Sequence, residues 1–166
     1  MIETPTYSPR LNLQPAGLSP APGLPSRPVI FKAVRVNADA HRISLALTVP
    51  EYLEAWISIP DAAPGSFTLA SPQENGYRLD HFSDDGSAVT ITGSYLFCHL
   101  RKMRLFWRKS TSALCVDSVV DFRIRGNFGS SVVELRHTAV ASADEYAWHD
   151  ALWRDSLEKL ALLFGS

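Results

Sequence analysis

One histidine of the sequence stands where it could take part in chemistry. His137 follows Val133 and Leu135 at alternate positions, so in a β-strand the three side chains would share one buried face. An imidazole on that face could orient a polar ligand or act as a general base, with the Tyr95 hydroxyl as the acid. We favour a core histidine bonded to the backbone or to a tyrosine hydroxyl, because no carboxylate of matching parity lies nearby.

The sequence offers no other pattern typical of a catalytic or metal site. It contains no Gly-x-Ser-x-Gly segment and no catalytic-cysteine signature. Its five histidines are scattered without the spacing of metal ligands, and so are Cys98 and Cys115, which we expect to be buried, reduced thiols. We therefore predict no catalytic residues, no metal and no cofactor, and an enzyme is the less favoured interpretation.

A basic segment between positions 101 and 109 could bind an anion. Arg104 and Arg108 alternate with apolar residues there, which would place them on the outer face of a sheet. Asp117 and Asp121 of the next predicted strand would then lie opposite them and could form ion pairs. We favour such a solvated, salt-bridged face, while a role in binding an acidic partner surface stays open.

The composition excludes several classes of protein. The 166 residues include 16 Lys and Arg against 17 Asp and Glu, a balance that argues against nucleic-acid binding through a strongly basic surface. No apolar run approaches the length of a membrane span. The first residues lack the basic and apolar regions of a signal peptide, so we expect a cytoplasmic protein.

The distribution of proline divides the chain once. Seven of the 11 prolines fall within residues 1–28. Proline lacks a backbone donor, and this segment shows no apolar period, so we predict a flexible tail over 1–28. Residues 29–166 would then form one domain with a core of its own.

The beginning of this domain predicts a strand followed by two short helices. Apolar and β-branched residues indicate the strand over 29–36. Asp39 can cap a helix over 40–48, and Pro50 fits the first turn of a second helix that runs through Trp56.

After the helices the apolar period changes from 3.6 to 2. Between residues 67 and 138 this period predicts six antiparallel strands joined by short turns, with one dry and one wet face. A stripe of bulky residues then predicts a long closing helix over 143–164. A curved sheet that packs its dry face on this helix is the natural arrangement of these parts, an α+β architecture.

The dry face is rich in aromatic side chains. Alternation with Tyr95 places Phe97 on this face, and Gly93 could mark a bulge or bend in the same strand. The aromatic set could line a hydrophobic pocket under the closing helix or simply fill the space, and both alternatives stay open. The residues predicted to line the pocket are Trp56, Tyr95, Phe97, Trp107, Phe122, His137, Trp153 and Leu157.

The chain resembles the helix-grip superfamily (START-like, Bet v 1-like, also called SRPBCC). Within it, the chain is similar to the domain at the C-terminus of the Hsp90 ATPase activator. The order and spacing of several segments carry the resemblance, rather than any single motif. These segments are Ala46 to Trp56 (ALTVPEYLEAW), Gly93, the alternating Met103, Leu105 and Trp107, Ser118 to Phe122 (SVVDF), Leu135 to His137 (LRH), and Leu152-Trp153 before Leu157 and Leu160.

The resemblance implies a fold in which the sheet grips the closing helix, and it leaves three hypotheses for function. The first is a non-enzymatic domain that binds a small hydrophobic molecule between sheet and helix. The second is a chaperone-associated or regulatory domain that binds a protein through its sheet face. The third, and least favoured, is an enzyme of the cyclase or hydratase kind that would use His137 and Tyr95.

Overall fold

The computed structural model describes residues 28–60, 62–73, 76–83 and 86–165 of the chain. The predicted tail over 1–28 therefore lies outside the described residues except for Pro28. One of the short turns expected between the strands, at Asn75-Gly76, is described only at Gly76. The elements in chain order are β1 (Ile30–Val36), α1 (Ala40–Thr48), α2 (Pro50–Trp56), β2 (Ala62–Gln73), β3 (Gly76–Ser83), β4 (Ala88–His99), β5 (Lys102–Ser110), β6 (Cys115–Asn127), β7 (Ser130–Thr138) and α3 (Ala143–Leu163).

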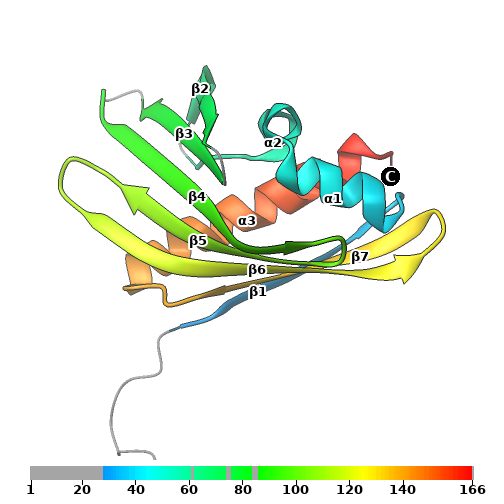
Figure 1. The fold of residues 1–166 in the computed structure, drawn as a ribbon. Helices are drawn as coiled ribbons and strands as arrows, with labels where there is room; N and C mark the ends of the chain where they lie inside the picture. The colour runs from blue at the N-terminus through cyan, green and yellow to red at the C-terminus, as the bar shows by residue number, and fades with distance from the viewer. Residues whose placement is uncertain (1–27, 61, 74–75, 84–85, 166) are drawn as a thin grey trace, which may run out of the picture.

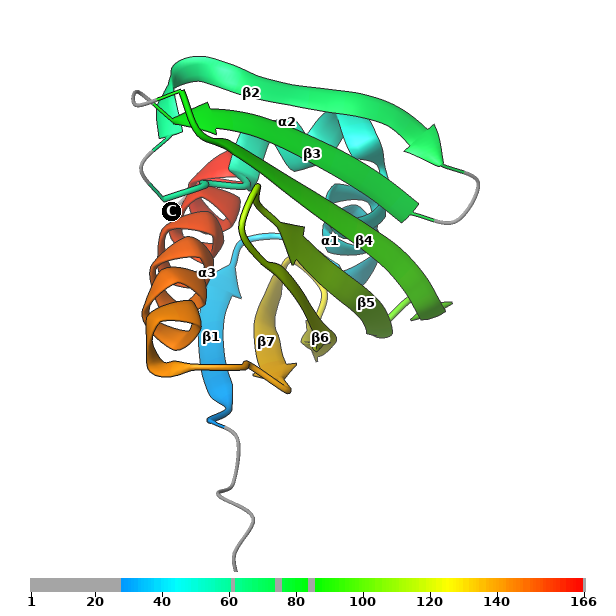
Figure 2. The same ribbon diagram turned by 90° about the vertical axis from the view of Figure 1, so that its left-hand side faces the viewer.

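All described strands belong to one antiparallel sheet of seven strands in the order β1-β7-β6-β5-β4-β3-β2. The strands from β2 to β7 form a meander, and β1 closes the sheet beside β7. The sheet curves around α3, and all three helices lie on its concave side (Figure 1). Seen from the side, α3 runs along β1 (Figure 2). The predicted α+β architecture, a sheet that grips its closing helix, is confirmed.

The helices begin where local chemistry allows them to begin. The Asp39 carboxylate accepts a hydrogen bond from the Arg42 backbone N–H at 2.9 Å, and Pro50 occupies the first turn of α2, where its missing donor costs nothing. The Ser142 hydroxyl caps α3 in the same way. The three helices lie where the sequence predicts them because these capping signals are local.

Alternation along the strands separates a dry inner face from a wet outer face. On β5, Met103, Leu105 and Trp107 are buried, whereas Arg104 and Arg108 are exposed. The predicted outer-face ion pairs form, with Arg104 Nε 2.6 Å from Asp121 and Arg108 Nε 2.6 Å from Asp117. The outer face is therefore the salt-bridged surface that the sequence predicts.

The strand β4 departs from the predicted alternation. Tyr95 pairs with Leu105, but Phe97 pairs with Arg104, because a bulge inserts one extra residue between them. The bulge turns Phe97 to the outer face, where 52% of the residue is exposed. The prediction that Phe97 shares the dry face with Tyr95 is therefore wrong.

Gly93 does not mark the bulge, which lies between Tyr95 and Phe97. It pairs with Tyr77 on the inner face, and the Tyr77 ring lies directly over it. A Cβ at position 93 would overlap that ring, so the glycine provides the space that the tyrosine needs. The prediction that the two cysteines are buried is wrong. Cys98 and Cys115 are both free thiols and both exposed.

No described helix is long and apolar enough to cross a membrane.

Candidate functional site

The inner face carries a chain of hydrogen bonds centred on His137. The Trp153 indole N–H donates to His137 Nδ1 at 2.9 Å, so the proton of the neutral ring lies on Nε2, which donates to the Ser118 hydroxyl at 2.6 Å. Ser118 in turn donates to the backbone oxygen of Trp107 at 3.2 Å. Both ring nitrogens of His137 are used, and the residue is fully buried.

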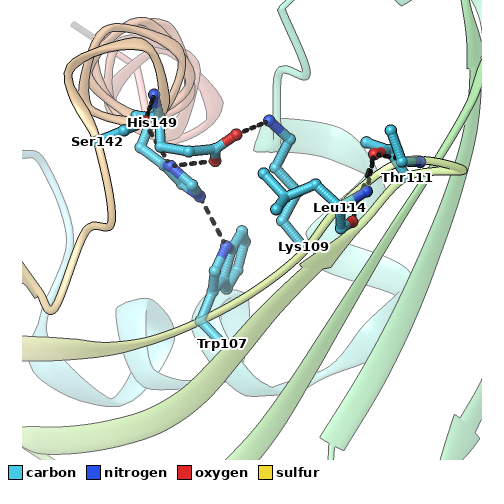
Figure 3. A network of polar contacts seen from close by, with 8 residues as sticks. Trp107, Lys109, Thr111, Leu114, Ser142 and His149 are labelled. Atoms are coloured by element: carbon cyan, nitrogen blue, oxygen red, sulfur yellow. Dashed lines mark hydrogen bonds and ion pairs between the residues drawn. The ribbon is translucent and has the colours of Figure 1, made fainter.

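A second histidine repeats this arrangement on α3. The Trp107 indole N–H donates to His149 Nε2 at 3.2 Å, and His149 Nδ1 donates to the backbone oxygen of Glu145 at 2.8 Å (Figure 3). The rings of His137 and His149 meet edge to face with centroids 4.6 Å apart, and Trp107 and Trp153 lie 4.9 Å apart. We call these four residues the Trp–His cluster.

Burial keeps both histidines of the cluster neutral. Loss of solvation lowers the pKa of His137 to about 3, and the neighbouring His149 contributes in the same direction. Burial likewise lowers the pKa of His149 to about 4, although Glu145 opposes this shift. A general base must exchange its proton near neutral pH and must reach a substrate. Neither condition is met at His137.

A buried ion pair lies beside the cluster. Lys109 Nζ is 2.9 Å from Glu145 Oε1 (Figure 3). The same nitrogen lies 4.1 Å from the centroid of the Trp148 ring. The second oxygen of Glu145, Oε2, has no hydrogen-bond partner among the described residues and lies 3.6 Å from His149 Nδ1. The pair ties the end of β5 to the first turn of α3.

The other predicted pocket residues also serve the core. The Trp56 indole donates to the Ala46 carbonyl at 2.8 Å, and the Tyr95 hydroxyl donates to the Leu47 carbonyl at 2.7 Å, so both hold α1. Burial raises the pKa of Tyr95 far above its ordinary value, which makes it a poor acid. Phe122 packs edge-on against Trp56 and Trp153, with ring centroids 6.5 and 5.8 Å apart.

Seven of the eight predicted residues therefore lie in or against the core between the sheet and the helices, and only Phe97 does not. Four residues of the site are not among those predicted from the sequence: Ser118, Lys109, Glu145 and His149. Two signals could have found most of them: Glu145 and His149 precede Trp153 at intervals of four on α3, and Lys109 shares the parity of Trp107 on β5.

A hollow lies on the outer face of the sheet. Its volume is about 440 Å³, and neither Trp107 nor Trp153 contributes to its lining. We call it the outer groove. Residues that line it include Phe31, Phe97, Lys102, Arg104, Asp121 and Arg136.

Five of these side chains form one row across five adjacent strands. Phe31 of β1 pairs with Arg136 of β7, which pairs with Asp121 of β6; Asp121 pairs with Arg104 of β5, and Arg104 with Phe97 of β4. The phenylalanines at the two ends are 63% and 52% exposed. Phe97 also stacks on His99, with ring centroids 6.4 Å apart. The bulge in β4 completes this row, since without it Phe97 would point inward.

Comparisons with known proteins bear on the fold. CV1439 from Chromobacterium violaceum has a TM-score of 0.63 at 16% identity, over 84% of this chain and 99% of that protein. The Aha1 dimer from Colwellia psychrerythraea has a TM-score of 0.58 at 15% identity, over 82% and 95%. DynU16, from the dynemicin biosynthetic locus, has a TM-score of 0.55 at 19% identity over 80% of this chain, which spans only 45% of DynU16.

These similarities establish the helix-grip fold alone. No protein-family model matches the sequence. A comparison with curated proteins likewise gives no match.

Proposed function

We propose that this protein is a non-enzymatic helix-grip domain, similar to the C-terminal domain of the Hsp90 ATPase activator. We further propose that it binds a protein partner through the outer groove. The observation that carries the proposal is that the polar groups of the inner face already form hydrogen bonds within the core. The indole, hydroxyl and imidazole groups of this face all form hydrogen bonds with other groups of the core. They belong to Trp56, Tyr95, Trp107, His137 and Trp153.

The outer groove lies on the face of the sheet that no described helix covers (Figure 1). It is hollow, and it presents two exposed aromatic rings with charged groups between them. Exposed aromatic and arginine side chains in one concave patch are typical of protein-binding surfaces. The Aha1 neighbour, whose structure is that of a dimer, is in keeping with a domain that makes protein contacts.

A photo-crosslinking amino acid placed in turn at positions 31, 97 and 128 tests this proposal in extracts of the cells that make the protein. Phe128 is the matched control, because it is a fully exposed phenylalanine in the β6–β7 turn and lies outside the groove. We expect the same cross-linked protein from positions 31 and 97 and no such product from position 128. Equal products from all three positions, or none from 31 and 97, would contradict the proposal.

A second candidate function is the binding of a small hydrophobic molecule. Its support is a smaller hollow of about 240 Å³ between α1, α2 and the end of α3, lined by Leu45, Tyr52, Leu163 and Phe164. Arg42 lies at the same site, with its guanidinium 5.1 Å from the centroid of the Phe164 ring. An apolar chain with one anionic group would suit this lining.

A fluorescent fatty acid is the probe for this alternative. If the hollow binds it, the probe gains fluorescence with the native protein and loses that gain in Tyr52→Ala and Arg42→Glu variants. A fluorescence gain that survives both substitutions would place the fatty acid elsewhere.

A further inference from the structure

We infer that the partner of the outer groove is an acidic, extended peptide segment of about seven residues with an apolar side chain at each end. This inference deepens the proposed function and rests on it. It follows from the charges, the spacing of the aromatic rings and the shape of the lining.

The charges of the outer groove are unbalanced. Asp121 is already paired with Arg104, and Glu134 with Arg125. Lys102, Arg123 and Arg136 also line the groove, and within the described part of the chain none of them makes an ion pair. Three cations that form no ion pair with any described residue, on the surface of a nearly neutral protein, favour a negatively charged ligand.

The spacing of the rings sets the length of the ligand. Phe31 and Phe97 stand four strand intervals apart, which corresponds to about 19 Å at the usual distance between strands. An extended peptide covers this distance in about six residue intervals, so a segment of about seven residues places its two end side chains on the same face, towards the two rings. Apolar side chains at the two ends of such a segment would reach the two rings, and carboxylates between them would reach Arg136 and Lys102.

The same features argue against a nucleic acid. Stacked bases need aromatic rings at neighbouring positions, whereas the two phenylalanines lie at opposite ends of the row. Asp121, which lies in the middle of the row, would also repel a phosphate chain. A peptide can place an uncharged or hydrogen-bonding side chain opposite Asp121, and a sugar–phosphate backbone cannot.

An NMR titration of the full chain labelled with nitrogen-15 tests the inference. The probe is a blocked seven-residue peptide with leucine at both ends, a serine in the middle and glutamates at the other positions. The control peptides carry serines or lysines in place of the glutamates. We expect the acidic peptide to shift the amide signals of Phe31, Phe97 and Arg136 saturably. The serine peptide should bind at least fivefold more weakly, and the lysine peptide should not bind.

Two charge reversals complete the test. Arg136→Glu should weaken binding of the acidic peptide at least fivefold. The control is Arg154→Glu, which makes the same change in net charge at an exposed arginine of α3. This substitution should leave the affinity unchanged. Equal effects of the two variants, or equal binding of all three peptides, would overturn the inference.

Other occupants would give different results, each of which contradicts an acidic peptide. Groove signals that shift with protein concentration alone would assign the groove to a second copy of the chain. Groove signals that change on deletion of residues 1–27 would assign it to the N-terminal segment, and shifts caused only by an oligothymidylate would assign it to nucleic acid. If cross-links form at positions 31 and 97 but the acidic peptide is silent, the proposed function stands and the partner chemistry is wrong.

Discussion

His137 and His149 are the residues on which the order of the inner face depends. Each accepts a hydrogen bond from a tryptophan and donates one to another group, so each fixes the orientation of two neighbours. A buried group that is fully bonded makes a modest net contribution to stability, but removing its partner is expensive. The two histidines therefore specify how Trp107 and Trp153 pack.

Replacement of one ring by an apolar side chain should reveal this dependence. In His137→Leu, the Trp153 indole N–H loses its acceptor inside the core, and we expect the free energy of unfolding to fall by about 2–3 kcal/mol. Urea denaturation measures it. Phe128→Ala, which removes a fully exposed ring, should change the stability by less than about 0.5 kcal/mol. A loss below about 1 kcal/mol for His137→Leu would show that the hydrogen bonds matter little.

The neutral state of the two histidines makes stability depend on acid. Their folded-state pKa values, about 3 and about 4, lie below the ordinary value of 6.5, so the unfolded chain binds protons more readily than the folded one. The free energy of unfolding therefore has its full value above about pH 6.5, where both histidines are neutral in either state. It decreases as the pH falls towards 4 and 3, because the unfolded chain takes up protons first. Between pH 6 and pH 4 each histidine should contribute a slope of about 1.4 kcal/mol per pH unit.

Urea denaturation at a series of pH values measures this slope. The double variant His137→Leu/His149→Leu should lose most of the acid dependence, although it is less stable at pH 7. A slope that the double variant retains would assign the dependence to carboxylates instead.

The parity of His137 and its place in the core could be predicted from the sequence, because alternation along a strand is a local property. Its partners could not. Ser118 and Trp153 are 19 and 16 positions away, and only the register of β6 on β7 and the docking of α3 bring them together. A lone serine or histidine in a sequence carries no signal of such a contact.

The elements are joined by a small number of polar contacts between helix and sheet. Lys109 and Glu145 are the clearest example, since both are nearly buried and belong to β5 and α3. Losing one partner leaves the other charge buried and unpaired, whereas replacing both by apolar groups is often tolerated. The pair should therefore matter more for how α3 is placed than for total stability.

A double-mutant cycle separates these contributions. Lys109→Met should lower the free energy of unfolding by about 3 kcal/mol because Glu145 loses its counter-charge, and Lys109→Met/Glu145→Leu should recover most of that loss. Urea denaturation of the four proteins gives the coupling. If the double variant loses the sum of the two single losses, the pair does not act as a unit.

Gly93 tests the fit between β3 and β4. In Gly93→Ala the new methyl group meets the Tyr77 ring, and we expect a loss of about 2 kcal/mol. In a Tyr77→Ala background the same substitution should cost less than about 0.5 kcal/mol, since the ring is gone. Thermal and urea denaturation check both values. An equal cost in the two backgrounds would show that the backbone, rather than the ring, requires glycine.

The positions of the helices could be predicted because caps and prolines act within one turn. The bulge in β4 could not be predicted, because a single extra residue between Tyr95 and Phe97 leaves no mark in the alternation of apolar residues. It nevertheless decides which face Phe97 lies on. The extra residue of this bulge therefore moves Phe97 from the inner pocket, where the sequence predicts it, to the outer groove.

The whole molecule combines a closely packed aromatic cluster on the inner face with an outer face that no described helix covers. The sequence left open whether the aromatic set lines a cavity or fills it, because the answer depends on how bulky side chains from distant strands pack together. In the structure Trp153 packs against both Trp107 and Phe122, and a hollow of about 440 Å³ lies on the outer face of the sheet. Recognition through the outer groove follows from this distribution of space and charge.

The indole N–H signals of Trp107 and Trp153 are direct reporters of this arrangement. We would record them by NMR in the full chain while adding first the acidic peptide and then a fatty acid. We expect both indole signals to keep their positions throughout, while the peptide shifts the amides of Phe31 and Phe97. Indole signals that move or broaden with the fatty acid, with silent groove amides, would show instead that the interior opens and that ligands bind beneath α3.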